Sequence, residues 1–481
     1  MFDILIKKGM VFDGTNKPPL KADIGIKGDL IIAVGDLDDS NAVNVIDASG
    51  LSVAPGFIDA HTHDDASLII RPDMEAKLSQ GVTTVICGNC GISGAPYDLM
   101  CEPPGLLRLV FKSEDFVAKD FDSYVSKVEE AKPSVNSAFF TGHTTLRMNA
   151  MGKNLDRAAT KKEIRIMKEQ LELALCQGSI GLSTGLFYAP ANAAPTSEVV
   201  ELARVLGPYG GIYATHMRDE ADFVVESVEE AINIGAKAKV PIIISHHKCQ
   251  GQHNHGKSVV TLQAMSEARK TQSIALDIYP YAASSTVLNE VSVLRADKTI
   301  VTWSEPYPQV SGRDLESIAT EFGVSKLDAM QKLLPGGAIY FMMDESDIER
   351  IMTSKNAMIG SDGLPEDTHP HPRLWGTFPR VLGHYARDRQ VMKMHDAVNR
   401  MTGLSAENFH LAGRGMLKPG FFADVTIFNQ DTIIDLATFD RPKRKSLGVE
   451  HVIVNGKTAW TDGKCVGAGQ GKVLKRRDRK A

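Results

Sequence analysis

The sequence has few cysteines, no long apolar run and no strong excess of charge. Six cysteines in 481 residues are too sparse for a disulfide framework, so we expect reduced thiols and a cytoplasmic protein. No apolar run approaches the ~20 residues that span a bilayer, and the N-terminus alternates like a strand rather than a signal peptide. The net charge of -5 offers no broad electrostatic attraction for nucleic acid, and the short basic tail at residues 475–480 is more simply interpreted as a solvated terminus. A small-molecule partner is therefore expected, with neither nucleic acid nor membrane; the oligomeric state stays open.

Short β-rich segments lie at both ends of the chain. Brief apolar or alternating runs separated by glycine turns occur before residue 54, and similar runs return after residue 424, including an Asn455-Gly456 hairpin signal. Isolated hairpins are only marginally stable. We therefore expect residues 1–54 and 415–481 to join into one small β-sandwich domain, and residues 55–414 to form a separate catalytic domain.

The middle of the chain alternates short apolar runs with helix-like stretches, which is typical of βα units and a parallel sheet. Eight candidate strands favour a closed (β/α)8 barrel of the TIM type. The alternative, an open doubly wound sheet, usually carries a glycine-rich phosphate loop, and no convincing one is present. The candidate strands cover residues 56–60, 83–87, 137–142, 179–184, 212–215, 240–245, 274–279 and 357–361.

One intervening helix has clear boundary signals. Thr160 and Glu163 form a capping box, apolar residues recur from there at helical spacing, and Gly178 stands where a C-terminal glycine cap belongs.

Potential metal ligands follow six of the eight candidate strands. His61 and His63 come directly after the first strand, and side chains two residues apart in an extended chain point to the same side. Alone, such a pair is more often two surface histidines. The joint pattern favours a metal site, because active sites of β/α barrels lie at the carboxyl ends of the strands. The other strand-end candidates are Cys90, His143, His216, His246 and Asp362.

His143, and the two residues Cys87 and His247 that lie close to candidate ligands in the sequence, allow other interpretations. Cys87 and Cys90 form a Cys-x-x-Cys, which elsewhere indicates a redox pair or half of a structural zinc site, but no second such pair exists. Cys87 lies within a strand and is expected to be a small buried residue. His247 should point away from His246. His143 could either reach the substrate or serve a structural role.

Several motifs together resemble the N-acyl-D-amino-acid deacylase (D-aminoacylase) family of the metal-dependent amidohydrolase superfamily, over essentially the whole chain. The motifs of this family occupy residues 55–65, 88–93, 215–220, 245–248, 360–365 and 371–376, the last of which reads His-Pro-Arg-Leu-Trp-Gly. The resemblance implies hydrolysis of the amide bond of N-acyl-D-amino acids to a carboxylate and a free D-amino acid.

The resemblance also implies the site residues. Cys90, His216 and His246 would hold one tightly bound zinc ion, and His61, His63 and Asp362 an adjoining, weaker position. Asp362 would be the catalytic proton carrier. Many superfamily members carry a carboxylated lysine after the fourth strand; the stretch 181–185 offers none, so Cys90 would supply the anionic ligand. The implied substrate-binding residues are Lys248, Tyr279, Ser285 and Arg373 for the carboxylate, with Phe187, Arg295, Tyr340 and Met343 around the substrate side chain.

The connection between the seventh and eighth candidate strands is far longer than an ordinary βα loop. We expect its residues, about 286–345, to form a lid over the catalytic face. In the family that the chain resembles, members that prefer hydrophobic substrates carry an aliphatic residue where this chain has Arg295. By this resemblance Arg295 favours an acidic substrate such as a D-glutamate or D-aspartate derivative, but a solvent-facing arginine is at least as good an interpretation. A cyclic-amide hydrolase of hydantoinase or dihydropyrimidinase type is the alternative function; the missing lysine and the presence of Cys90 argue against it. A barrel that has lost catalysis is disfavoured because all six ligands are present.

Overall fold

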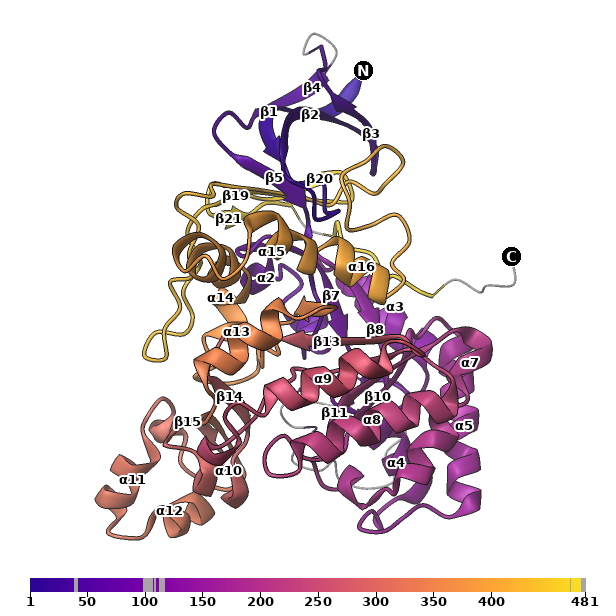
Figure 1. Ribbon diagram of the computed structural model, residues 1–481, viewed down its shortest axis with the longest axis vertical. Helices are drawn as coiled ribbons and strands as arrows, with labels where there is room; N and C mark the ends of the chain where they lie inside the picture. Colours follow the sequence, from indigo (N-terminus) through magenta and orange to yellow (C-terminus); the bar gives the residue numbers. More distant parts are fainter. Residues whose placement is uncertain (39–41, 98–106, 108–109, 112–116, 468, 477–481) are drawn as a thin grey trace.

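The computed structural model describes residues 1–38, 42–97, 107, 110–111, 117–467 and 469–476. A β/α barrel forms the body of the molecule, a sheet built from both chain ends lies at one end, and a small inserted unit projects from the other (Figure 1).

All eight strands predicted for the barrel are present. They pair in parallel. The first and last residues of each strand lie within two residues of the ends predicted from the sequence. In barrel order the strands are β6 (Phe57–Asp59), β7 (Val82–Cys87), β8 (Asn136–Phe139) continued by β9 (Thr141–Gly142), β10 (Gly181–Gly185), β11 (Ile212–His216), β12 (Ile242–Ile244), β13 (Ile274–Ile278) and β17 (Ala357–Ile359).

Backbone hydrogen bonds close the barrel where its two sheets meet. The Ala60 N–H donates to Ile359 O at 3.1 Å, which joins β6 to β17, and the Ile180 N–H donates to Phe139 O at 2.9 Å beside β10. The open doubly wound sheet is therefore excluded. Inward residues such as Ile58, Ala214 and Ile243 fill the barrel, and Phe409 belongs to the same buried cluster.

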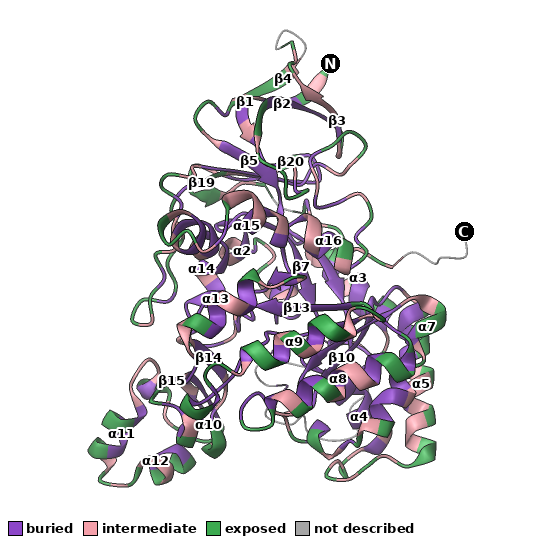
Figure 2. Cartoon of the chain, in the orientation of Figure 1, coloured by how far each residue is buried: buried purple, intermediate pink, exposed green. Residues whose placement is uncertain are grey.

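Helices surround the barrel with buried inner and exposed outer faces (Figure 2). The predicted helix after Thr160 is α5, where the full capping box is present and Gly178 has φ +113°. The helices outside the insertion are α1 (Ser67–Ile70), α2 (Glu75–Leu78), α3 (Phe121–Ala131), α4 (His143–Met151), α5 (Lys161–Cys176), α6 (Thr196–Ala203), α7 (Leu206–Tyr209), α8 (Val224–Ala238), α9 (Ser258–Ala268), α13 (Glu345–Thr353), α14 (Arg373–Arg380), α15 (Met394–Arg400) and α16 (Gly403–Asn408), with short turns η4 (Ala191–Ala193) and η5 (Gln252–Asn254) and a π-helix η7 (Val381–Asp388).

Both ends of the chain contribute to one nine-stranded sheet. Its order is β21-β20-β19-β18-β5-β1-β2-β3, with β4 also paired to β1, so the two termini meet where β5 pairs with β18. Ile6, Ile24 and Ile427 belong to the apolar cluster that the sheet buries. The last described residues leave the sheet, since Leu474 N–H donates to Ser137 O beside β8. The strands are β1 (Phe2–Val11), β2 (Leu20–Lys27), β3 (Leu30–Gly35), β4 (Ala42–Asp47), β5 (Ser52–Pro55), β18 (Val425–Phe428), β19 (Val449–Val454), β20 (Lys457–Thr461) and β21 (Lys464–Cys465).

The connection between β13 and β17 forms a unit with its own core. Its antiparallel sheet has the order β14-β16-β15, and Tyr340, Leu315 and Met330 belong to its buried cluster. It lies at the lower left in Figure 1. Its elements are β14 (Ala283–Val287), α10 (Glu290–Arg295), β15 (Lys298–Ser304), η6 (Pro308–Val310), α11 (Leu315–Phe322), α12 (Lys326–Lys332) and β16 (Gly336–Phe341).

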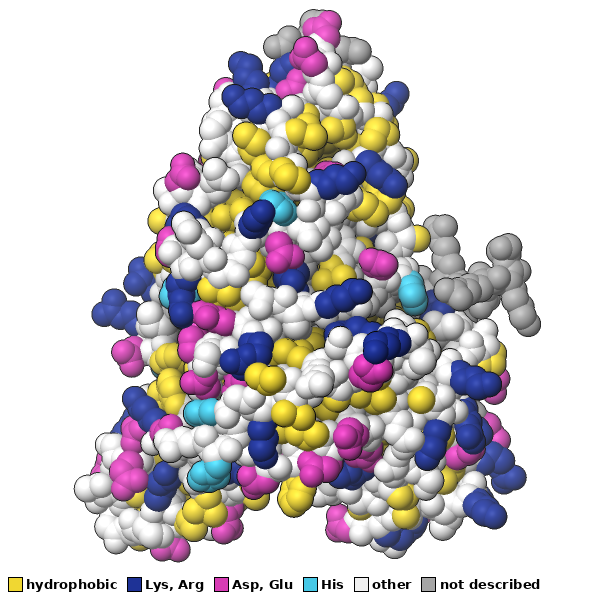
Figure 3. Space-filling view, viewed as in Figure 1, with side chains coloured by type: hydrophobic (Ala, Val, Ile, Leu, Met, Phe, Trp, Pro, Cys, Tyr) yellow, Lys and Arg dark blue, Asp and Glu magenta, His cyan; other side chains and the backbone are white. Residues whose placement is uncertain are grey.

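Acidic and basic side chains intermingle on the face drawn in Figure 3. Within the part of the chain that the structure describes, no helix has both the length and the apolar character needed to cross a membrane.

Candidate metal centre

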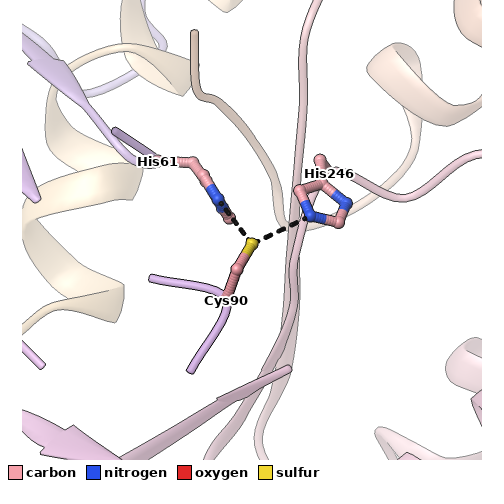
Figure 4. Close-up of side chains that lie close together, drawn as sticks. All are labelled: His61, Cys90 and His246. Atoms are coloured by element: carbon pink, nitrogen blue, oxygen red, sulfur yellow. Dashed lines mark hydrogen bonds between the residues drawn. The ribbon is translucent and has the colours of Figure 1, made fainter. Parts of the chain in front are cut away.

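Cys90 lies at the centre of a buried group of histidines. Its Sγ is 3.4 Å from His61 Nε2, 3.3 Å from His246 Nε2 and 3.7 Å from His216 Nδ1. Figure 4 shows His61, Cys90 and His246 converging from three separate segments. Zinc–sulfur and zinc–nitrogen bonds of about 2.3 and 2.0–2.1 Å at a tetrahedral angle separate the two ligand atoms by about 3.5 Å. The spacing and the donor types therefore fit one zinc ion.

The second predicted group is also assembled. Asp362 Oδ1 lies 3.6 Å from His61 Nε2 and 3.3 Å from His63 Nε2, so the two histidines of the first motif do face one point. The atoms of His61, His63 and Asp362 could hold a metal together, and so could those of His61, Cys90 and His246. The two positions adjoin through His61.

The barrel geometry explains why these side chains meet. On β11 the side chains of Ile212 and Ala214 point into the barrel, and His216 continues the same row because side-chain direction repeats every second residue. The other ligands come from the carboxyl ends of neighbouring strands, the face at which β/α barrels place their active sites.

Three of the candidate ligands have a left-handed backbone, which costs a non-glycine residue about 1–3 kcal/mol. Cys90 has φ 52°, His246 has φ 35° and Asp362 has φ 49°. Glycine makes the Cys90 loop possible, since a Cβ at Gly88 would lie 2.3 Å from Phe140 O and one at Gly185 would lie 2.3 Å from Cys90 O. Strain concentrated on the ligands is characteristic of a functional site.

The charges at the centre suit an anionic thiolate. Burial opposes ionisation of Cys90, but the adjacent His61 and His246 outweigh burial and hold the pKa of the thiol well below its ordinary value. Burial likewise opposes the charged form of Asp362, and Arg373 outweighs it, so the pKa of that carboxyl is also well below its usual range. Burial lowers the pKa of His63, but the hydrogen bond with Asp362 raises it to about 9. The side chains of the centre thus form a network of paired charges.

Carboxylates that the sequence analysis did not identify lie behind the histidines. Glu220 Oε1 is 3.1 Å from His246 Nδ1 and Glu220 Oε2 is 3.5 Å from His216 Nε2, while Asp277 Oδ1 is 3.3 Å from His61 Nδ1. Glu220 belongs to the motif 215–220, so its place in that motif was the available signal. Asp277 is a polar residue within a buried strand, which is itself a signal for a paired role.

A buried lysine joins the first and last strand ends. Lys77 Nζ lies 2.8 Å from Asp59 Oδ2 and 3.0 Å from Asp64 Oδ2, and it donates to Ser361 Oγ at 3.0 Å. Asp59 Oδ1 in turn accepts the Ser361 N–H at 2.7 Å. This network, which the sequence analysis also missed, fixes the segments that carry His61, His63 and Asp362.

The residues predicted for carboxylate recognition lie together beside Asp362. Arg373 is buried, stacks at 4.4 Å from the Tyr279 ring centre and donates to Ser285 O at 3.1 Å. Its Nη1 is 3.0 Å from Asp362 Oδ2. Lys248 Nζ lies 5.6 Å from the Tyr279 ring centre. A small cavity at the centre is bounded by Ser285 and, among others, His63, Cys90, Tyr188, His246, Thr286 and Asp362.

The residues predicted around the substrate side chain have varied surroundings. Phe187 stacks on His216 with ring centres 5.6 Å apart. Tyr340 is buried in the insertion, where its hydroxyl donates to Val287 O at 2.9 Å, and Met343 belongs to the same core. Arg295 is paired with acids, with Nη2 3.4 Å from Asp222 Oδ2 and 3.7 Å from Asp219 Oδ2.

The three ambiguous residues have identifiable surroundings. His143 Nε2 lies 3.1 Å from Glu198 Oε1, in a buried cluster that also contains Arg147, which favours the structural role. His247 Nε2 instead faces Thr261 Oγ1 at 2.8 Å, away from the metal cluster as expected. Cys87 is buried with its sulfur 3.3 Å from Thr62 Oγ1, and it carries no disulfide.

Comparison with known proteins places the chain in a family. The sequence model that describes the amidohydrolase family matches residues 44–288 and 317–459 of this chain. A D-aminoacylase of Alcaligenes xylosoxydans xylosoxydans is 50% identical over 99% of this chain and 98% of its own length, and an N-acyl-D-glutamate deacylase of that organism is 44% identical over 94% and 93%.

A solved structure gives the same result. The N-acyl-D-glutamate deacylase of Bordetella bronchiseptica, complexed with zinc and a phosphonate inhibitor that mimics the tetrahedral intermediate, has a TM-score of 0.96 and 42% identity, covering 98% of this chain and 99% of the other. A D-hydantoinase structure shares the fold at a TM-score of 0.60, with 16% identity and full coverage of both chains. The chain belongs to the amidohydrolase family and, within it, to the N-acyl-D-amino-acid deacylases.

Proposed function

We propose that the protein is a zinc-dependent hydrolase that cleaves N-acyl-D-amino acids to a carboxylate and a free D-amino acid. The observation that carries the proposal is the buried Cys90 thiolate among His61, His216 and His246, with Asp362 and Arg373 beside it. Neither a redox Cys-x-x-Cys nor a non-catalytic barrel requires this set of ligands.

Cys90, His216 and His246 are the proposed ligands of one tightly held zinc ion, and His61, His63 and Asp362 those of a second, weaker position. When bound, zinc polarises an amide carbonyl and lowers the pKa of water toward about 7. The thiolate supplies the negative charge for which other members of the superfamily use a carboxylated lysine.

Asp362 is the proposed proton carrier. Arg373 keeps it ionised, so it can accept the proton of the attacking water and then deliver it to the nitrogen of the leaving amino acid. Its position between His63 and Arg373 places the proton acceptor between the proposed metal position and the proposed carboxylate anchor.

Arg373 is the proposed anchor for the substrate carboxylate, with Lys248, Tyr279 and Ser285 around it. A guanidinium binds a carboxylate through two parallel hydrogen bonds. Since Arg373 Nη1 is 3.0 Å from Asp362 Oδ2, a carboxylate held by the same guanidinium brings the neighbouring amide close to Asp362. This arrangement favours linear amides that carry a free carboxylate.

The insertion is the proposed lid. Ser285 and Thr286 from β14 already line the cavity beside Cys90, which supports a role for this unit in excluding water. Phe187, Arg295, Tyr340 and Met343 remain our candidates for the side-chain pocket. A preference for acidic D-amino acids requires Arg295 to leave Asp219 and Asp222, or to share its charge with them.

The names of the relatives support both the chirality and the metal. The D-aminoacylase and N-acyl-D-glutamate deacylase relatives act on D-amino-acid derivatives by name, and the Bordetella bronchiseptica structure contains zinc. We also propose a cytoplasmic location, since the metal centre requires Cys90 as a free thiol. The hydantoinase alternative is supported by the fold alone.

A paired substrate assay tests the proposal. The zinc-loaded protein would be assayed for amine release from N-acetyl-D- and N-acetyl-L-leucine, glutamate and aspartate, and for ring opening of a hydantoin, with metal content determined on the same sample. Release from D-substrates alone is expected. Cleavage of the hydantoin in preference to the linear amides would overturn the proposal.

A further inference from the structure

We propose that Glu220 is the positioning residue that orients both zinc-binding histidines of β11 and β12; this inference rests on the zinc site proposed above. Glu220 lies in the loop after β11 and is 2% exposed. A carboxylate so deeply buried requires partners on both oxygens. Its partners are the histidines themselves and two residues that follow β12.

The two histidines use opposite ring nitrogens. His216 presents Nδ1 to Cys90 Sγ at 3.7 Å and Nε2 to Glu220 Oε2 at 3.5 Å. His246 presents Nε2 to Cys90 Sγ at 3.3 Å and Nδ1 to Glu220 Oε1 at 3.1 Å. A proton on the nitrogen that faces the carboxylate leaves the lone pair of the other nitrogen directed at the metal position. One carboxylate thus faces both rings, each through a different oxygen: the 3.1 Å contact with His246 is within hydrogen-bonding distance, and the 3.5 Å contact with His216 is an ion-pair contact without a hydrogen bond.

Other contacts hold Glu220 in place behind the histidines. Gln250 Nε2 donates to Glu220 Oε2 at 2.9 Å and the Gln250 N–H donates to Glu220 O at 2.7 Å, so one residue fixes both ends of the glutamate. Lys248 Nζ donates to Glu220 Oε1 at 2.7 Å. It also lies 2.8 Å from His246 Nδ1, but a protonated Nδ1 cannot accept from an ammonium, so both groups donate to the carboxylate of Glu220. The distances among His216, Glu220 and His246 would by themselves allow these three residues to hold a further metal ion. The ammonium of Lys248 balances the charge of Glu220 and makes metal binding at that position unfavourable.

A structural ion pair with Lys248 is the competing explanation of Glu220. That explanation predicts loss of stability without loss of metal affinity. Glu220→Gln separates the two roles, because glutamine keeps the shape but offers a single oxygen acceptor, and its NH2 group faces whichever histidine the oxygen does not. Glu230→Gln is the matched control: Glu230 is a partly buried glutamate on α8 that binds Arg218 at 2.9 Å through both oxygens.

The experiment measures the zinc dissociation constant by chelator competition and the visible spectrum of the cobalt-substituted protein, which reports on ligand geometry around Cys90. We expect Glu220→Gln to bind zinc about 10- to 100-fold more weakly and to change the cobalt spectrum. The Glu230→Gln control should keep both properties of the unaltered protein. Folding is checked by circular dichroism.

If Glu220→Gln fails to fold because Lys248 is left unpaired, the double variant Glu220→Gln/Lys248→Met removes that charge and carries the same test. Zinc affinity equal to that of the unaltered protein, in whichever of the two variants folds, would overturn the proposal. Failure of the unaltered protein to bind zinc or release amine would instead overturn the proposed function.

Discussion

Asp362 illustrates how a single residue connects the two halves of the site, since its two carboxylate oxygens face His63 and Arg373. Asp362→Ala should lower kcat by roughly 10³-fold or more, because proton transfer is lost both to and from the reacting groups. Most of the zinc should remain, since Cys90, His216 and His246 are untouched. Steady-state kinetics and metal analysis of the same preparation measure the two effects. Substantial residual kcat would remove Asp362 from the role of proton carrier.

A substitution of Arg373 can distinguish the contribution of its positive charge from that of its planar guanidinium. Arg373→Lys keeps the charge but loses the planar fork and the stacking on Tyr279. We expect kcat/KM for an N-acyl-D-amino acid to fall roughly 10- to 100-fold, which corresponds to about 1.4–2.7 kcal/mol of binding to the transition state. Exposed Lys162→Arg on α5 is the control and should leave kcat/KM unchanged. If kcat/KM barely moves in Arg373→Lys, the carboxylate anchor lies elsewhere.

At the scale of single residues, the sequence predicted which histidines lie together at the centre but not the carboxylates that face them. His61, His63 and His216 could be identified because they follow strand-like runs, and strand ends converge at one face of a barrel. Glu220 and Asp277 are two acids among 59, and their roles depend on which histidine nitrogen they face. That information exists only after the strands are aligned in space.

At the scale of elements, the buried Lys77 of the short helix α2 links the first and last strand ends of the barrel. Lys77→Met should lower the free energy of unfolding by about 3–5 kcal/mol, because Asp59 and Asp64 would be left as buried, uncompensated charges. Urea unfolding measures the change, with exposed Lys162→Met as the control. A loss below about 1 kcal/mol, the range of surface ion pairs, would contradict the assigned role.

The capping box of α5 gives a prediction that depends on pH. The hydrogen bond from Arg157 lowers the pKa of Glu163 from 4.5 to about 2, and the Thr160 N–H adds to the effect. Because the folded pKa is below the unfolded value, this stabilisation is fully present above about pH 4.5 and is lost as the pH falls toward 2.

Glu163→Gln tests this dependence, since glutamine preserves the capping box but not the ion pair. The variant should be less stable by about 0.5 kcal/mol near neutral pH, a value typical of solvent-screened pairs. The difference between the two proteins in the free energy of unfolding by urea should narrow as the pH falls from about 5 toward 2. A difference that stays constant with pH would show that the Glu163 charge makes no contribution.

The elements themselves were largely predictable. All eight barrel strands are buried, and most are short apolar or β-branched runs, which have few alternatives once they alternate with helices. The strands β8 and β10 are more polar, with the sequences Asn-Ser-Ala-Phe and Gly-Leu-Ser-Thr-Gly. The arrangement of the insertion was not predictable, since the order β14-β16-β15 places the last strand of the unit between the first two. Sequence periodicity marks a strand but carries no information about its neighbours.

At the scale of the whole molecule, the ligands come from segments between residues 61 and 362, so the centre exists only when the barrel is closed. Zinc should therefore stabilise the entire barrel: at a free concentration 100 times Kd, binding adds about 2.7 kcal/mol to the free energy of unfolding. Thermal unfolding with and without a chelator measures the change. An identical Tm in both conditions would contradict a zinc centre within the fold.

The most direct test of the account is a zinc titration of the metal-free protein, with amine release from N-acetyl-D- and N-acetyl-L-amino acids followed in parallel. We expect no activity without metal, recovery of activity as the proposed tight position formed by Cys90, His216 and His246 fills, and amine release from the D-substrates alone. Full activity without metal, or zinc-dependent release from the L-substrates but not the D-substrates, would contradict it.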